Sequence, residues 1–471
     1  MLRLVSLITI LIYLLLPSND CHNTINENLQ WAEVTAVRLV NCYYKNLTGY
    51  WSDEGRWQSG NTLESMANFI ALIDAPLKYI FDHTFIRTSQ YAGGNCYDDH
   101  QWWLLAWLQI YNVEPNIKYL RRAADIHDTV STKSWNASVC GGGVKWCPSN
   151  LYKNAITNEL FFASSMRLHP YATLLGKSSN YYLDWALKEW QWFENSGMIN
   201  ADFLINDGLS INNNTCVNNR GTTWTYNQGV ILSGLALLYN ATGNATLLTV
   251  AQNIADATIE HLVYGNGILK EPCEPNCDND QKLFKGIFIR HLSYLLPYLT
   301  DTVHIQKYST FLHVNALSLL TNDRCETDGL FGLYWNNHSS DSCQSPRNAA
   351  TTSSALDLFV SAAKNEQSSS LRSSTWTLLG LGNCMDDKNA SMPNFYSDRV
   401  NETVCRTTAS EDPSALAYDY QLKCDGSGFC RIRTLSDQQH TPSGFRYDDG
   451  SARNVTHTNK MVLTNCYLRI N

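Results

Sequence analysis

The sequence predicts an all-α fold, an (α/α)6 barrel, followed by a small disulfide-rich, β-containing module. Two observations support this prediction. From residue 26 to residue 363 two kinds of helical segment alternate, six of each kind, and after that point the long apolar segments cease. A double ring of helices needs this alternation, because its inner helices are buried on all sides and its outer helices on one side only.

The segments predicted as outer helices carry their apolar residues in one stripe, as Ile117, Leu120 and Ala124 show. The segments predicted as inner helices are apolar on all faces, as in GVILSGLALLY. The outer segments are 26–45, 75–90, 116–133, 180–196, 245–263 and 305–321, and the inner ones are 59–73, 97–111, 154–168, 225–240, 284–299 and 349–363.

The connections predict which end of the barrel carries the functional site. Those after inner helices are mostly short, whereas those before them are long and rich in Gly, Trp, Asn and Cys. Long ordered loops in a compact domain are usually functional, so we expect these loops to gather at one mouth, beside the N-termini of the inner helices. They are residues 134–153, 200–223, 264–283 and 322–348.

Cysteine pairs within these loops predict disulfides. No histidine accompanies them at the spacing of a zinc site, and we expect no metal and no cofactor. The expected pairs are Cys140/Cys147, Cys273/Cys277 and Cys325/Cys343.

Residues 1–20 predict a signal peptide, because Arg3 precedes an apolar run, Leu4 to Leu16, that is too short to span a bilayer comfortably. An uncleaved anchor is the alternative. Fifteen cysteines and nine N-x-[ST] sequons agree with a secreted, extracellular glycoprotein that does not associate with membranes after signal cleavage. The formal charge of −8 argues against nucleic acid as a partner.

The chain changes character after the barrel. Residues 364–379 predict a linker that includes a Ser-rich stretch, and residues 380–471 predict a small module with five cysteines and many turn residues. This module faintly resembles PAN/apple domains, which bind proteins or sugars. A stabilising appendage without a ligand is the alternative.

Two adjacent aspartates, Asp98 and Asp99, open the second predicted inner helix in the stretch YDDHQWW. Asp98 with Gln101 could be a simple capping box. A glycosidase, however, needs two carboxyl groups, about 5–5.5 Å apart in retaining enzymes. At the helix start we expect one carboxylate to be held ionised by backbone N–H groups and the other to have a raised pKa beside tryptophan.

Polar and aromatic residues cluster at the start of every predicted inner helix. Each cluster alone could be capping chemistry, but six around one cavity predict a groove for a polyhydroxylated ligand. The members that we assign to substrate binding from these clusters are Trp57, Asn61 and Trp102.

Four stretches, YDDHQWWLLAW, NAITNELFF, TWTYNQGVILSGLALLY and FKGIFIRHLSYL, together resemble the endo-α-1,6-mannanases of glycoside hydrolase family 76. The resemblance covers residues 27–363 and implies an (α/α)6 barrel and a retaining mechanism. It implies that Asp98 is the nucleophile and Asp99 the acid/base, with Glu159 as the competing acid. The groove-lining positions that it implies are Asn158, Glu159, Tyr226, Asn227, Gln228, Lys285 and Gly286.

The function that we expect is that of a secreted endo-acting hydrolase of α-1,6-mannosidic linkages in mannan. One alternative is a transglycosylase acting on mannan or on GPI glycans, although the C-terminal stretch NCYLRIN lacks the hydrophobic tail of a GPI signal. Another is a non-catalytic mannan-binding protein. The sequence does not predict the oligomeric state.

Overall fold

The computed structural model describes residues 27–365, apart from 74, 76, 89–93, 213–214, 326–327 and 337–341. Beyond residue 365 it describes the strands between Trp376 and Arg469, together with Cys405 and Ala409. The predicted signal peptide and most of the predicted linker lie outside the described residues. In the described part of the chain, no helix combines the length and the apolar character that a membrane crossing requires.

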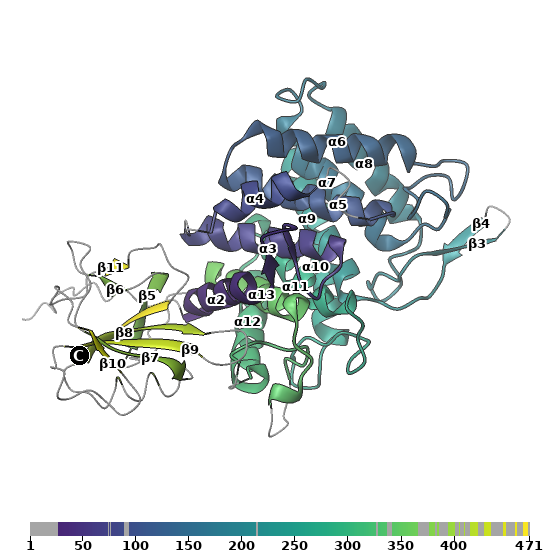
Figure 1. The fold of residues 1–471 in the computed structure, drawn as a ribbon. Coiled ribbons are helices and arrows are strands. Elements are labelled where there is room, and N and C mark those ends of the chain that lie inside the picture. Colours follow the sequence, from purple (N-terminus) through teal and green to yellow (C-terminus); the bar gives the residue numbers. More distant parts are fainter. Residues whose placement is uncertain are drawn as a thin grey trace, which may run out of the picture.

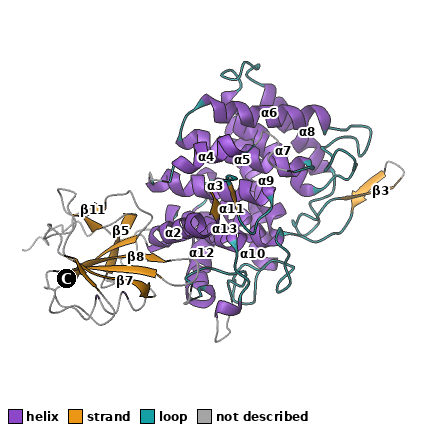
Figure 2. Ribbon diagram, in the orientation of Figure 1, coloured by secondary structure: helices purple, strands orange, loops and turns teal. Residues whose placement is uncertain are grey.

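Twelve helices between Glu27 and Lys364 form two concentric sets of six, as predicted (Figures 1 and 2). The outer helices are α2 (Glu27–Arg38), α4 (Tyr79–Arg87), α6 (Ile117–Lys133), α8 (Tyr181–Asn195), α10 (Ala245–His261) and α12 (Thr302–Ser318). The inner helices are α3 (Arg56–Ile73), α5 (Tyr97–Val113), α7 (Ala155–Leu168), α9 (Thr225–Thr242), α11 (Phe284–Leu295) and α13 (Ala349–Lys364).

The inner helices close into a ring, because each packs against its inner neighbours and α13 packs back against α3. All-round burial explains their composition: in α5 every residue from Trp102 to Leu108 is buried. Gly286 of α11 lies so close to α13 that a Cβ there would be 2.5 Å from the Cα of Ser354. The predicted groove residue Gly286 therefore permits a helix contact.

Three outer helices and four inner helices begin differently, although the inner helix α13 has an Asn348 capping box and the outer helices α4 and α8 have no side-chain cap. An Asn or Asp side chain caps the outer helices α6, α10 and α12 by accepting a backbone N–H group of the first turn. No side-chain cap closes the inner helices α5, α7, α9 and α11. Their first turns point into the mouth region, where polar side chains make other contacts.

Strands follow the barrel, as predicted for the module. Six of them form an antiparallel sheet in the order β10-β7-β9-β8-β12-β5, and β5 contacts α2 of the barrel (Figure 1). Their bounds are β5 Trp376–Leu381, β7 Asn394–Val400, β8 Ala415–Leu422, β9 Gly428–Thr434, β10 Arg446–Asp448 and β12 Asn465–Arg469. The short strands β6 (Cys384–Met385) and β11 (His457–Thr458) pair with each other. The Cys405–Cys430 disulfide lies within this module.

Disulfides join the mouth loops in a way that was only partly predicted. Cys273–Cys277 and Cys325–Cys343 are confirmed. The predicted pair Cys140/Cys147 is wrong, because Cys147 bonds to Cys96 and Cys140 bonds to Cys216. Cys216 belongs to the hairpin of β3 (Leu209–Asn212) and β4 (Thr215–Asn218). These two bonds therefore connect residues 134–153 with α5 and with the next mouth loop, and do not close a single loop on itself.

Candidate active site

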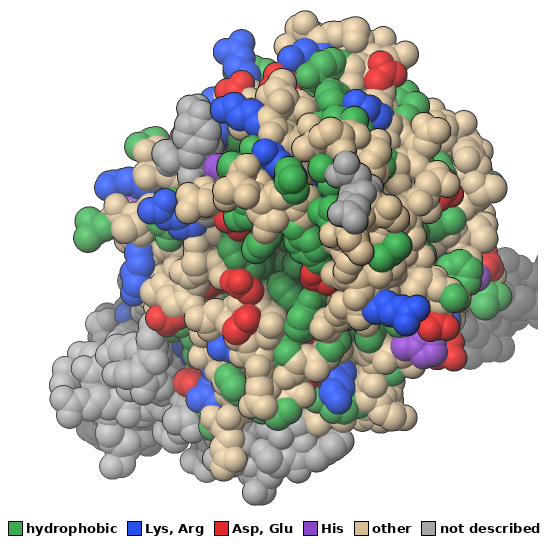
Figure 3. Space-filling view, turned by 90° about the vertical axis from the view of Figure 1, so that its right-hand side faces the viewer, with side chains coloured by type: hydrophobic (Ala, Val, Ile, Leu, Met, Phe, Trp, Pro, Cys, Tyr) green, Lys and Arg blue, Asp and Glu red, His purple; other side chains and the backbone are tan. Residues whose placement is uncertain are grey.

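The long connections meet at one end of the barrel, together with the N-termini of the inner helices (Figure 2). The face at this end is hollowed at its centre (Figure 3). Hydrophobic side chains form the floor of the hollow and acidic side chains lie around it. We call this hollow the groove.

Asp98 and Asp99 lie in the first turn of α5, and both carboxylates face the same space. One oxygen of each carboxylate lies within 4.8 Å of the other. The capping-box alternative is wrong, because the residue that precedes the helix as its N-cap is Cys96. The Gln101 amide instead donates to the carbonyl oxygen of Thr157 in α7, at 3.0 Å.

The loop before α7 fixes the position of Asp98. The indole N–H of Trp146 donates to Asp98 Oδ2 at 2.9 Å, and the backbone N–H of Asp99 donates to Asp98 Oδ1 at 3.0 Å. The Cys96–Cys147 disulfide and the hydrogen bond from Tyr97 N to the Trp146 carbonyl, 2.8 Å, bind the same loop to the helix start. Asp98 is thus held from two sides.

Backbone groups hold Asp99. The N–H groups of Cys96 and Asn95 donate to its carboxylate. The chain passes so close that a Cβ on Gly94 would lie 2.3 Å from Asp99 Oδ2. A glycine is therefore required at position 94 for this approach.

Burial changes the protonation of both aspartates. It raises the pKa of Asp98 to about 8, with a further increase from the negative charge of Asp99. It raises the pKa of Asp99 to about 6, and Asp280 adds to this shift. The backbone N–H groups at the helix start lower both pKa values, but desolvation outweighs them, so neither pKa is held below its usual range. Between these two pKa values the pair holds one proton.

Four aromatic rings from four inner helices stack in a row beneath the mouth. Trp57 stacks on Trp102 with ring centroids 5.6 Å apart, Trp102 on Tyr226 at 6.4 Å, and Tyr226 on Phe284 at 3.7 Å. Trp102 and Phe284 are buried, whereas Trp57 and Tyr226 are half-buried. The structure thus brings three predicted residues together and adds Phe284.

Asp280 is a site residue that sequence reasoning missed. It is exposed, and Oδ1 of its carboxylate accepts from the Trp57 indole at 3.1 Å and from the Gln58 amide. Its charge acts on Asp99. No pattern in the loop distinguishes Asp280 from Asp278, so only the fold could identify it as a third carboxylate of the groove.

Two amides predicted to line the groove instead anchor the mouth loops. The side-chain amide of Asn158 accepts a hydrogen bond from the backbone N–H of Val144 at 2.7 Å and donates one to the Val144 carbonyl oxygen at 3.1 Å. It thus pairs with Val144 in the way that a residue of a neighbouring β-strand would. Gln228 does the same with Ile205, accepting at 2.7 Å and donating at 2.9 Å. We call these two residues the amide anchors. Both are fully buried.

We expect Asn158→Leu to lower the free energy of unfolding by roughly 2–4 kcal/mol, because it leaves buried N–H and C=O groups of Val144 unpaired. Chemical denaturation measures this loss. Asn195→Leu is the matched control, because the Asn195 amide makes an exposed bond of 2.7 Å to the Gln191 carbonyl. An Asn158→Leu variant as stable as the control variant would show that the anchor contributes little.

The remaining predicted residues lie beneath the groove. Lys285 is buried, forms an ion pair with Glu274 at 2.7 Å, and donates to the Leu333 carbonyl at 2.7 Å. Asn61 accepts from Arg290 at 2.6 Å. Glu159 and Asn227 are fully buried, and burial raises the pKa of Glu159 well above its usual value.

The described residues contain one group of three potential metal ligands, Cys96, Asp98 and Asp99. The sulfur of Cys96 is bonded to Cys147, so this group offers no thiolate. Two carboxylates at the groove remain, and their chemistry is that of proton transfer and nucleophilic attack.

Comparisons with known proteins agree with this geometry. The model of glycosyl hydrolase family 76 matches residues 30–374. A Schizosaccharomyces pombe protein provisionally assigned as a mannan endo-1,6-alpha-mannosidase is 28% identical over 348 residues, which cover 67% of this chain and 75% of that protein. The mannan endo-1,6-alpha-mannosidase DFG5 of Candida albicans is 33% identical over 196 residues, 39% of this chain and 42% of that protein.

Among solved structures, the GH76A alpha-1,6-mannanase from Salegentibacter sp. HEL1_6 has the same fold, with a TM-score of 0.64 and 22% identity. The match covers 72% of this chain and 100% of that chain. An inactive variant of that enzyme, in which two consecutive aspartates are replaced by alanine, was solved in complex with alpha-1,6-mannotetrose.

Proposed function

Because the chain belongs to glycosyl hydrolase family 76, we propose that it is a secreted, retaining glycoside hydrolase that cleaves α-1,6-mannosidic linkages within mannan. Membership of the family makes the chain a glycoside hydrolase. The substrate, the endo mode, the stereochemistry and the secretion are parts of the proposal.

The observation that supports it most is the placement of Asp98 and Asp99. One oxygen of each carboxylate lies within 4.8 Å of the other, which supports the shorter carboxyl separation, about 5–5.5 Å, of retaining glycosidases. In the Salegentibacter enzyme, the inactive variant is one in which two consecutive aspartates are replaced.

In the proposed reaction, Asp98 attacks the anomeric carbon while Asp99 protonates the departing glycosidic oxygen. Asp99 then removes a proton from water, which releases the glycosyl group from Asp98 with net retention. In the free protein the two adjacent carboxyls share one proton between pKa values of about 6 and about 8. The proposal therefore requires substrate binding to favour the form with the proton on Asp99.

Mannan as the substrate is supported by the groove and by the relatives. Half-buried Trp57 and Tyr226 offer ring surfaces, and exposed Asp280 offers hydrogen-bond acceptors, for a polyhydroxylated chain. The related proteins are named for α-1,6-mannan linkages. Secretion is supported by the sequons and by the disulfides of the mouth loops.

The test is release of mannooligosaccharides from linear α-1,6-mannan, followed by chromatography and by proton NMR of the newly formed reducing ends. We expect oligosaccharides of mixed length whose first-formed anomer is α. The dependence of kcat/KM on pH should be bell-shaped, with limbs near the pKa values of about 6 and about 8, because the active pair holds one proton.

Release of mannose alone would contradict the endo mode, and a β anomer would contradict retention. Absence of any product from α-1,6-mannan, in a preparation that is folded by circular dichroism, would contradict the substrate. Products longer than the starting chains, formed when an acceptor oligosaccharide is added, would identify transglycosylation as the main reaction.

A further inference from the structure

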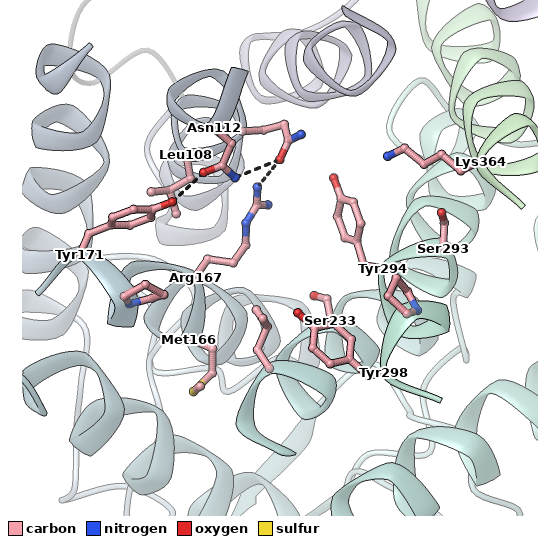
Figure 4. Close-up of a pocket in the computed structure, with 14 residues that line it drawn as sticks. Leu108, Asn112, Met166, Arg167, Tyr171, Ser233, Ser293, Tyr294, Tyr298 and Lys364 are labelled. Carbon is pink, nitrogen blue, oxygen red and sulfur yellow. Dashed lines mark hydrogen bonds between the residues drawn. The ribbon is translucent and has the colours of Figure 1, made fainter. Parts of the chain in front are cut away.

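A second cavity lies at the opposite end of the barrel from the groove. Figure 4 shows the side chains that line it. It has a volume of about 380 Å³ and is lined by the C-terminal turns of the inner helices α5, α7, α9, α11 and α13. This volume is within the range of small-molecule sites. Asp98 and Asn112 mark the two ends of α5, about 21 Å apart at the helical rise per residue, so the cavity is separate from the groove.

The charged side chains that line this second cavity, which we call the distal cavity, are all cationic. Arg167 and Lys364 contribute cationic groups, and no Asp or Glu is among the described residues that line it. Both cations lie within 6 Å of the Tyr294 ring centroid, the Arg167 guanidinium at 5.7 Å and the Lys364 ammonium at 5.9 Å. Figure 4 shows Tyr294 between them.

Two buried carboxylates behind the cavity form ion pairs with the two arginines. Lys364 is not part of these ion pairs. Arg167 forms an ion pair with Glu64 at 2.6 Å, and Arg290 contacts Glu64 at 3.6 Å and Asp357 at 3.1 Å. No hydrogen bond or ion pair joins Lys364 to the described part of the chain. Its side chain is exposed at the cavity rim, and its ammonium group points towards Tyr294. The cluster thus has one more cation than it has carboxylates.

The other walls are mainly apolar or aromatic. The polar side chains Gln109, Asn112, Ser233 and Ser293 also line the cavity, and the first three already hold hydrogen bonds within the protein. Tyr171 and Tyr298 present rings, Leu108 and Met166 present aliphatic surface, and the Tyr171 hydroxyl is already bonded to Asn112 at 2.8 Å. These walls can bury a ring but offer few hydrogen-bond partners for a sugar. They favour a ligand with an apolar body and one charged end.

The geometry points to a binding site in the distal cavity for a small carboxylate that carries an apolar ring, with the carboxylate at Lys364 and the ring among the tyrosines. A competing explanation is that Arg167 and Lys364, which lie in the last turns of α7 and α13, only offset the negative ends of these helices. That explanation requires no ligand.

Isothermal titration calorimetry of the full chain at pH 7 with sodium phenylacetate tests the inference. Phenylacetamide, which has the same shape without the charge, is the control ligand. We expect saturable one-to-one binding of phenylacetate at millimolar concentration and binding of the amide that is weaker by roughly tenfold or more.

Variants locate the binding. Lys364→Met should weaken phenylacetate binding by roughly tenfold or more, whereas Lys364→Arg should restore it. Lys133→Met is the matched control, because Lys133 is an exposed lysine in the last turn of α6, away from the cavity lining, and it should bind phenylacetate as wild type does. Absence of saturable binding, equal binding of the amide, or unchanged binding in Lys364→Met would each overturn the inference and leave the helix-end explanation.

Discussion

Replacement of Asp98 by alanine is expected to lower hydrolysis of α-1,6-mannan by at least about 10⁴-fold, since a missing nucleophile prevents formation of the glycosyl-enzyme. Replacement of Asp99 by alanine should cost roughly 10²–10⁴-fold on mannan, where the leaving group must be protonated. It should cost much less in the first step on an aryl α-mannobioside, whose phenolate departs without a proton.

Added azide separates the two roles. With Asp99→Ala, azide should attack the accumulated glycosyl-enzyme, restore turnover and yield an α-glycosyl azide, because it needs no general base. With Asp98→Ala, any azide product should have the β configuration, since azide would then attack the substrate directly. Asp202→Asn, a change at an exposed aspartate of a mouth loop, is the control and should be fully active.

The opposite pattern would reverse the assignments. Because the pair shares one proton in the free protein, this outcome decides which carboxyl gives its proton to the leaving group. If both variants hydrolysed mannan at the wild-type rate, the aspartate pair would not be the catalytic pair, and the proposed function would lose its main support.

The second large effect is expected from Arg290→Met. Arg290 is buried in the barrel interior between Glu64 and Asp357, with N–O distances of 3.6 and 3.1 Å, and both carboxylates are buried. Removal of the cation leaves Asp357 without its ion-pair partner and Glu64 with Arg167 alone, so we expect a loss of about 3–5 kcal/mol in the free energy of unfolding. Urea denaturation measures it.

The control is Lys307→Met, which removes an ion pair of 2.9 Å with Asp256 that lies near the surface. Its cost should be below about 1 kcal/mol. A similar cost in both variants would show that the buried network contributes no more than a surface pair.

The loss in Arg290→Met should also depend on pH. In the native protein burial alone would raise the pKa of Glu64, but Arg290 and Arg167 lower it to about 2. Its ion pairs therefore add stability that is present above the ordinary pKa of glutamate and is lost as the pH falls towards 2. Without Arg290 the pKa values of Glu64 and Asp357 should rise. At lower pH these carboxyls are then protonated, and their buried negative charges no longer destabilise the variant. The deficit should be smaller at pH 5 than at pH 8.

The barrel was predictable because each helix must satisfy one simple burial requirement. A stripe such as Ile117, Leu120 and Ala124 needs one buried side, and the apolar run from Trp102 to Leu108 needs burial all round. These patterns are local, and the structure confirms all twelve helices that they predict.

The details of the site depend on contacts between distant segments, which no local pattern contains. Cys140 and Cys147 are close in sequence. In the folded protein, however, the packing of the loops places Cys147 beside Cys96 and Cys140 beside Cys216. An asparagine such as Asn158 is a residue type that often binds sugars. Only its two hydrogen bonds to the backbone of Val144, seen in the structure, show that it is an anchor. The protonation of Asp98 depends in the same way on how deeply the surrounding loops bury it.

The amide anchors have a consequence for the evolution of specificity. Each anchor belongs to the inner helix that follows its own loop, and it bonds to the loop backbone at one residue, Val144 or Ile205. Beyond Val144, Trp146 and Cys147 tie the loop to Asp98 and Cys96, so that segment is constrained. Beyond Ile205, the hairpin of β3 and β4 can change in sequence without altering the attachment. A lineage could therefore vary this hairpin, and adapt to differently branched polymers, while the aspartate pair stays where the helices place it.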